Sequence, residues 1–186
     1  NITDNMFLFI KIDTNGIPET KNTKYYNYTD LTKYNNSRII RLSWGIWDYN
    51  NKKIKNVSYL VKYDDVVINI KNTKYHGITT KMIKEQGIKS DVVFDELKND
   101  LNNIKFVISH NMYFTENVLF SELYRNNEHD LINNIKNKEL ICIAKKTTDI
   151  LKLKTAGSYG YKMPKFEELY KYCFKTNYDI SNTFNN

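Results

Sequence analysis

Short apolar runs separated by polar turns mark the N-terminal part of the chain. The run Met6–Ile12 is followed by the turn-forming sequence DTNGIP, which predicts a buried first strand. Arg38–Tyr49 is rich in strand-favouring residues and Lys55–Tyr63 alternates, so the two predict a hairpin with NNKK as its turn. Glu19–Tyr34 is polar, rich in Tyr, Asn and Lys, and predicts a long loop.

Helical and strand patterns alternate in the second half of the chain. Asp91–Leu101 has helical spacing, with Asp91 placed to cap the helix. The short strand Lys105–Ser109 leads into a helical segment beginning at His110, and a further strand, ELICIA, precedes a helix that starts near Pro164. The apolar positions that we expect on one side of the first two helices are Val92, Phe94, Leu97, Leu101, Phe114, Val118, Leu119 and Leu123.

This order of elements predicts the fold class. Three strands come first and are followed by alternating helices and strands, which indicates a mixed sheet with helices on its faces, an α/β three-layer domain. The 186 residues fit one domain with a substantial core, and we find no internal repeat and no linker. We therefore predict a single domain over residues 1–186.

The charge balance points to an anionic partner. Lys and Arg total 28 against 21 for Asp and Glu, a net charge of +7. A basic surface attracts polyanions, of which nucleic acid is the commonest. Lys-rich coding in an A/T-rich genome would produce the same excess, so composition alone leaves both interpretations open.

The two cysteines, Cys142 and Cys173, each lie in an apolar run. This placement predicts buried free thiols in a reducing compartment rather than a disulfide or a metal site. We find no signal peptide and no apolar stretch long enough to span a bilayer. We therefore expect an intracellular, cytoplasmic protein without a membrane partner.

Four segments then suggest a family. They are FLFIKIDTNGIP (Phe7–Pro18), KYHGITTKMIKEQG (Lys74–Gly87), ISHNMYFTENVLFSEL (Ile108–Leu123) and YDISNTFNN (Tyr178–Asn186). In order, spacing and strand-then-helix context they resemble the motifs of the DEDDh (DnaQ-like) 3′–5′ exonuclease family. The resemblance implies an RNase H-like fold with a mixed five-stranded central sheet flanked by helices. It also implies a domain that is truncated, or continues, after the third motif.

The same resemblance implies a chemistry that this chain has largely lost. In the family, four carboxylates hold two divalent metal ions about 3.5–4 Å apart, and a histidine acts as general base. Here the matching positions are Lys11, Asp13, Thr115, Tyr178 and Thr183. Asp13 alone keeps an acidic side chain, and Lys11 reverses a charge. Because hard cations need oxygen ligands of negative charge, we expect no metal cofactor, and Mg²⁺ or Mn²⁺ only if the inactive interpretation is wrong.

Neighbouring acids do not restore the set. Glu116 follows Thr115, but adjacent helical residues project about 100° apart. Asp179 follows Tyr178, and in the family an acid at that place accompanies the catalytic residues without replacing them. We expect Lys11 to pair with Asp13 in the cleft, and contact between Lys11 and a nucleic-acid phosphate is the sharper alternative.

Other motif residues are candidates for nucleic-acid contact. By resemblance, Thr14, Asn15 and Gly16 form a turn that approaches the terminal nucleotide. A loop with interleaved Lys and Tyr precedes the last helix and could reach the cleft with stacking platforms. Structural roles compete, since Phe114 suits a core and Asn111 suits a turn. The complete candidate set is Lys11, Thr14, Asn15, Gly16, His76, His110, Asn111, Phe114, Tyr159, Tyr161 and Lys162.

Three hypotheses of function follow. The first is a catalytically inactive exonuclease-like domain that binds RNA or single-stranded DNA through a basic cleft. The second is a structural or protein-interaction module that kept only the fold, and the third is an active 3′–5′ exonuclease with an unusual metal site. The Asn-rich composition with this motif set resembles homologues from large DNA viruses of protists, for which the viral factory or the virion would be the place of action.

Overall fold

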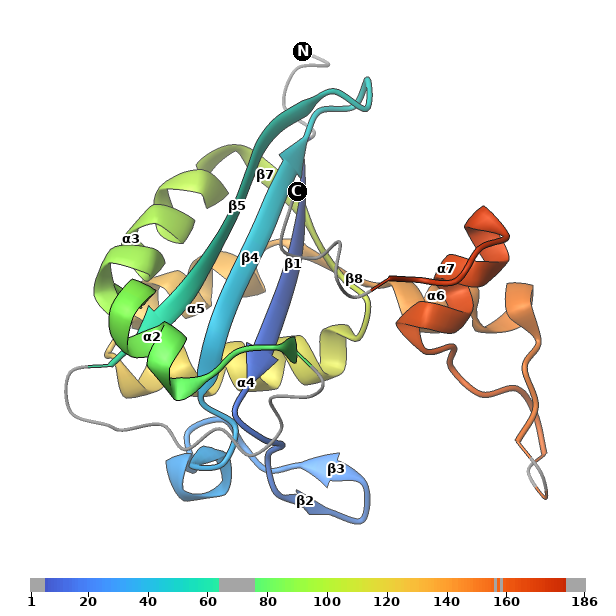
Figure 1. Ribbon diagram of the computed structural model, residues 1–186, viewed down its shortest axis with the longest axis horizontal. Helices are drawn as coiled ribbons and strands as arrows, with labels where there is room; N and C mark the ends of the chain where they lie inside the picture. Colours follow the sequence, from blue (N-terminus) through green and yellow to red (C-terminus); the bar gives the residue numbers. More distant parts are fainter. Residues whose placement is uncertain (1–5, 64–75, 156, 158, 180–186) are drawn as a thin grey trace.

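A six-stranded mixed sheet forms the centre of the protein (Figure 1). The computed structural model describes residues 6–63, 76–155, 157 and 159–179. The strand order is β6-β5-β4-β1-β7-β8, so β1 lies inside the sheet, antiparallel to β4 and parallel to β7. The strands are β1 (Met6–Thr14), β4 (Ile39–Trp47), β5 (Lys53–Lys62), β6 (Ile88–Lys89), β7 (Ile104–Ser109) and β8 (Glu139–Cys142).

The mixed α/β class is confirmed, with helices flanking a central sheet. The strand count is six rather than five, because the two-residue β6 adds a parallel edge beside β5. The helices are α2 (Thr80–Gln86), α3 (Ser90–Asp100), α4 (Met112–Arg125), α5 (His129–Lys136), α6 (Ile143–Leu151) and α7 (Phe166–Phe174), with a 3₁₀ turn at Leu101–Asn103. The sequence pattern did not single out α2, α5 or α6.

The predicted hairpin of β4 and β5 is confirmed, but the long loop before it is not. Within Glu19–Tyr34, two short strands pair with each other and a 3₁₀ helix closes the segment; these are β2 (Thr20–Lys21), β3 (Lys24–Tyr25) and Leu31–Tyr34. Tyr34 is buried and its hydroxyl donates to the carbonyl of Tyr26. A buried aromatic anchor thus orders a segment whose polar composition predicts a loop.

Alternation along β1 separates two faces of the sheet. Leu8, Ile10 and Ile12 are buried on the inner face, which α3, α4 and α5 cover (Figure 1). Phe9 and Lys11 project from the opposite, outer face and are exposed. The inner face therefore holds the core, and the outer face remains available for a site.

Three details differ from expectation. Helix α3 begins at Ser90, so Asp91 lies in the first turn of the helix and not at its N-cap. In the first turn, the carboxylate of Asp91 accepts a hydrogen bond from the N–H of Val92. Val92 is exposed and Val93 is buried in its place. Both cysteines are free, but Cys142 is only partly buried and Cys173 is exposed on α7. Amphipathic spacing places a helix well, but small errors of phase exchange neighbouring residues between core and surface.

Helices α6 and α7 form a group of their own beyond β8, on the right in Figure 1. We refer to residues 143–179 as the C-terminal lobe. No residue of α7 is buried. Among the helices that the structure describes, none combines the length and the apolar character needed to cross a membrane.

Candidate nucleic-acid groove

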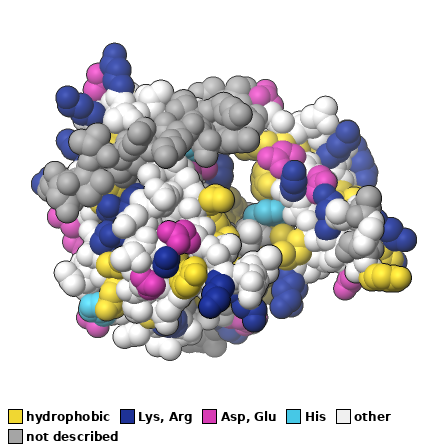
Figure 2. Space-filling view, turned by 90° about the horizontal axis from the view of Figure 1, so that it is seen from below, with side chains coloured by type: hydrophobic (Ala, Val, Ile, Leu, Met, Phe, Trp, Pro, Cys, Tyr) yellow, Lys and Arg dark blue, Asp and Glu magenta, His cyan; other side chains and the backbone are white. Residues whose placement is uncertain are grey.

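A groove of about 440 Å³ separates the outer face of the sheet from the C-terminal lobe. Figure 2 shows this side of the molecule hollowed between the body and the lobe, with hydrophobic side chains on the walls. The residues that line the groove are Phe9, Ile10, Lys11, Ile12, Ser43, Trp44, Gly45, Trp47, Asn56, Ile108, Ser109, His110, Asn111, Phe114, Thr115, Ile143, Phe166 and Tyr178. Six of the residues singled out in the sequence therefore lie on one groove, and none of the described residues that line it carries a carboxylate.

Asp13 lies beyond the groove lining and is bound by an arginine from the next strand. Asp13 and Arg41 are direct partners across β1 and β4. Arg41 donates to Asp13 Oδ2 from Nε at 2.6 Å and approaches the same oxygen with Nη2 at 2.5 Å. Lys11 Nζ is 3.9 Å from Asp13 Oδ1. The expected pair of Lys11 and Asp13 is thus only a long contact, and Arg41 is the main partner of Asp13.

Thr115 occupies the second-motif position at the start of α4. It is buried, and its hydroxyl shares a hydrogen bond of 2.8 Å with the hydroxyl of Ser109 at the end of β7. The following residue, Glu116, does not line the groove, and burial raises the pKa of its carboxyl while Lys136 lowers it. This placement agrees with the expectation that Glu116 points away from Thr115, because adjacent helical residues project about 100° apart.

His110 and Tyr178 meet on the lobe side of the groove through Phe166. His110 Nε2 is 3.0 Å from the carbonyl of Pro164, which ties the end of β7 to the start of α7. The ring edges of His110 and Tyr178 both pack against Phe166, at centroid distances of 5.6 and 5.0 Å. Tyr178 also packs against Tyr170. Tyr178 is therefore part of an aromatic cluster.

His76 is buried near the Asp13–Arg41 pair, outside the groove lining. Its Nδ1 accepts from the N–H of Ile78 at 3.1 Å, and its buried Nε2 has no hydrogen-bond partner among the residues described. Burial lowers the pKa of His76, opposing the raising effect of the Asp13 carboxylate, and Arg41 and Lys11 lower it further.

The turn after β1 has a structural role. Thr14 donates its hydroxyl to the carbonyl of Gly16, and Asn15 accepts from the N–H of Arg38 at 2.7 Å. A Cβ on Gly16 would lie 2.4 Å from the carbonyl oxygen of Asn36, so only glycine fits this close approach. These three residues join the end of β1 to the segment before β4 and do not line the groove.

The remaining candidates divide between fold and surface. Asn111 caps α4, its side chain accepting from the N–H of Phe114. Tyr159 and Tyr161 are exposed, and Lys162 pairs with Glu168 at 2.6 Å. None of these three residues lines the groove. Thr183 lies outside the described residues.

The donor set does not fit two divalent cations. Lys11 brings an ammonium, both close contacts of Asp13 Oδ2 are to Arg41, and the hydroxyl of Thr115 is bonded to Ser109. Among the described residues no group of three His, Cys, Asp or Glu side chains is arranged to hold a metal ion. Hard cations need several oxygen ligands, and these positions do not offer them.

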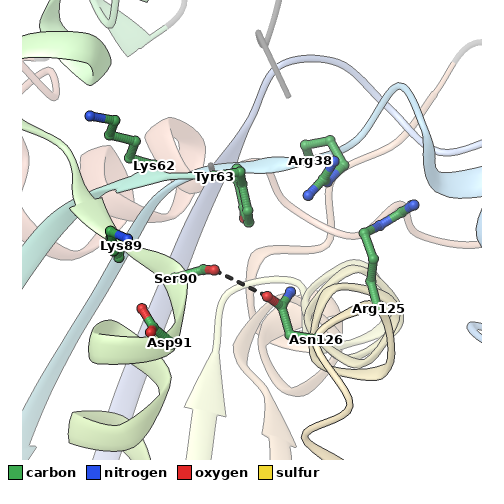
Figure 3. Close-up of a pocket in the computed structure, with 8 residues that line it drawn as sticks. All are labelled: Arg38, Lys62, Tyr63, Lys89, Ser90, Asp91, Arg125 and Asn126. Atoms are coloured by element: carbon green, nitrogen blue, oxygen red, sulfur yellow. Dashed lines mark hydrogen bonds between the residues drawn. The ribbon is translucent and has the colours of Figure 1, made fainter. Parts of the chain in front are cut away.

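A second pocket of about 270 Å³ lies between the start of α3, the end of α4, the start of β4 and the end of β5 (Figure 3). Arg38 stacks over the Tyr63 ring at 4.2 Å and donates from Nε and Nη2 to the buried Glu122 at 2.9–3.1 Å. The Ser90 hydroxyl donates to Asn126 across the pocket. These contacts join the sheet to α3 and α4.

Comparison with solved structures shows what this architecture resembles. E. coli exonuclease I bound to a dT13 oligonucleotide matches with a TM-score of 0.65 at 15% identity, over 90% of this chain and 35% of that one. The same enzyme with a dA16 oligonucleotide gives 0.64 at 16% identity, over 90% and 35%. The chain has the RNase H-like exonuclease fold. An exonuclease I complex with an SSB C-terminal peptide gives 0.65 at 15% identity, over 90% and 36%.

The chain thus spans about a third of the length of these exonucleases. No family model and no curated protein sequence matches it. At this level of identity the likeness establishes the fold alone.

Sequence reasoning missed Arg41, Phe9 and Trp47. Arg41 lies in a β-rich run that predicts a strand, but its position opposite Asp13 depends on the register of β1 and β4. Phe9 and Trp47 read as core residues in apolar runs, whereas both line the groove. The alternation of β1 was the available signal, since Phe9 shares its parity with Lys11.

Proposed function

We propose that this chain is a catalytically inactive exonuclease-like domain that binds single-stranded nucleic acid, RNA or DNA, along the groove. The observation that carries the proposal is the Arg41 guanidinium on Asp13, the acidic residue left among the described catalytic positions. Lys11, Asp13 and Arg41 together bring a net positive charge to the place where the family binds metal ions. Positive charge there favours a phosphate and opposes a divalent cation.

Binding rather than mere retention of the fold is supported by the charge of the groove surroundings. Among the described residues that line the groove, Lys11 alone carries a formal charge, and its side chain is 54% exposed. The C-terminal lobe, which contributes Ile143, Phe166 and Tyr178 to the groove lining, has eight lysines and four acidic residues in its sequence. Exonuclease I binds oligonucleotides with the same fold, which supports the groove as the contact surface.

A labelled single strand tests the proposal directly. With Mg²⁺ or Mn²⁺ present, we expect the strand to be bound and not shortened, with an affinity that falls steeply as salt rises. Lys11→Gln should reduce the salt slope by about one unit. Lys81→Gln is the matched control, because Lys81 is 81% exposed on α2 and does not line the groove. Shortening of a 5′-labelled strand that Asp13→Ala abolishes would instead establish an active nuclease.

Protein interaction is a second candidate, favoured by α7. Phe166, Tyr172 and Phe174 are 43–65% exposed on a helix that buries none of its residues. Exposed aromatic side chains on one short helix are typical of an interaction surface. Absence of oligonucleotide binding at low salt would favour this function over the first.

A further inference from the structure

The outer face of the sheet carries two groups of aromatic rings. In the first, Phe7 stacks on Phe106 at 5.2 Å and on Tyr49 at 6.4 Å. In the second, Phe9 meets Trp47 edge-on at 5.3 Å. The rings come from β7, β1 and β4, with Tyr49 just beyond the end of β4. Phe9 is 40% exposed and Trp47 is partly exposed, although both belong to central strands.

Gly45 creates the space that Trp47 occupies. Gly45 lies between Phe9 on β1 and Asn56 on β5 in the pairing register. A Cβ at Gly45 would lie 2.2 and 2.6 Å from carbons of the Trp47 ring. The indole therefore covers the glycine and borders the groove beside Phe9. We refer to Phe9 and Trp47 as the aromatic platform.

The charges around the platform select a ligand class. Lys11 follows Phe9 by two residues on the same face of β1, and Lys105 lies 5.1 Å over the ring of Phe106. Among the described residues, no carboxylate lines the groove beside Phe9 and Trp47. Exposed aromatic rings beside a lysine, on a lining without a described carboxylate, match a single strand, whose bases stack while its phosphates meet lysine. An apolar protein segment would use the rings but not the cations.

We infer that the aromatic platform is a stacking site for unpaired nucleobases, with Lys11 facing the adjacent phosphate. This inference rests on the proposed function and adds the class of ligand and the residues that hold it. Neither Phe9 nor Trp47 is among the positions that match the exonuclease catalytic set. A sheet face with exposed aromatics can stack bases in any sequence, because every base has a π-face.

The fluorescence of Trp47 can report base stacking at the aromatic platform. The chain has two tryptophans, and Trp44 is buried, with its indole N–H bonded to Asp100. In a Trp44→Phe protein, oligothymidylate should quench the emission of Trp47, whereas an abasic strand of equal length should bind more weakly and quench little. The reciprocal Trp47→Phe protein, which keeps Trp44, should bind without a change in emission.

Affinity provides the second readout. Phe9→Ala should weaken binding of oligothymidylate roughly five- to a hundredfold, the range expected for loss of one stacked base. Tyr172→Ala is the matched control, since Tyr172 is similarly exposed on α7 away from the platform. Because Phe9 is partly exposed, its removal leaves little buried cavity, and thermal unfolding of both variants verifies the fold.

The outcomes separate the two proposals. Binding by anisotropy with no change in Trp47 emission would overturn the stacking site and leave nucleic-acid binding by the chain intact. No binding of either strand at low salt would overturn both. Equal affinity for the abasic strand and the oligothymidylate would also reject the platform, since phosphate contact alone would then account for binding.

Discussion

Asp13 and Arg41 face each other across β1 and β4, and the guanidinium holds one carboxylate oxygen through two nitrogen atoms. The side chains are 15% and 7% exposed, so water competes little for either group. An arginine in this position satisfies the carboxylate in the way a metal ion would, but with an organic cation fixed to the neighbouring strand. The pair therefore ties the Asp13 carboxylate to the neighbouring strand of the sheet.

Breaking this pair should destabilise the fold. We expect Arg41→Met to lower the free energy of unfolding by about 3 kcal/mol, because a mostly buried carboxylate is left without its main partner. A double-mutant cycle with Asp13→Asn should give a coupling energy of roughly 1–3 kcal/mol by urea denaturation. Lys11→Met should cost under about 1 kcal/mol, since Lys11 is exposed and its contact is long. Equal effects of the two replacements would contradict the assignment of Arg41 as the main partner.

Breaking the ion pair of Arg38 and Glu122 should lower the free energy of unfolding more than breaking an exposed ion pair does. Both side chains are nearly inaccessible and joined by three hydrogen bonds. Glu122→Gln should reduce the free energy of unfolding by about 3–5 kcal/mol, because a neutral amide replaces the carboxylate that accepts three hydrogen bonds from the buried Arg38 guanidinium. The control is Glu19→Gln, which breaks the exposed pair with Lys33 and should cost under about 1 kcal/mol. Urea denaturation of the two variants measures the contrast.

His76 predicts a loss of stability on acidification. Because burial lowers its pKa in the fold, the unfolded chain takes up a proton first, at a pH near 6.5. The free energy of unfolding should therefore fall as the pH drops from about 6.5 to the folded-state pKa of His76, and should level off below that pKa. His76→Gln should flatten this part of the stability profile, whereas His129→Gln, at an exposed position, should not. Parallel profiles for wild type and His76→Gln would reject the prediction.

Substitutions of Asn111 can separate an effect on the stability of α4 from an effect on oligonucleotide binding. Its side chain caps α4, so Asn111→Ala should lower the free energy of unfolding by about 0.5–2 kcal/mol. Asn111→Asp and Asn111→Ser keep an acceptor and should retain most of that stability. Oligonucleotide affinity is then measured well below the unfolding transition. If Asn111→Asp and Asn111→Ser bind as the wild type does and only Asn111→Ala binds more weakly, Asn111 acts by capping the helix. A loss of binding in all three variants would indicate direct contact by the amide.

The sequence predicts the mixed α/β class and the main strands in their order along the chain, because both depend on local pattern. It also shows directly which residues stand at the motif positions. Apolar runs bounded by turn residues specify β1, β7 and β8, and helical spacing specifies most of α3 and α4. That Lys11 and Thr115 stand at positions resembling acidic ones, and Tyr178 at a position resembling a histidine, is likewise an inference from the sequence alone. The predicted loop before β4 failed because tertiary burial of Tyr34 overrides local polarity.

Tertiary structure decided what surrounds those residues. Strand register places Arg41 on Asp13, and register depends on pairing between distant segments rather than on the pattern of either strand. The same register sets Gly45 beside Phe9 and opens the space for Trp47. An apolar run indicates that its side chains avoid water on average. Only the packing of helices on one face of the sheet decides that Phe9 and Trp47 border a groove while Leu8 and Ile46 are buried.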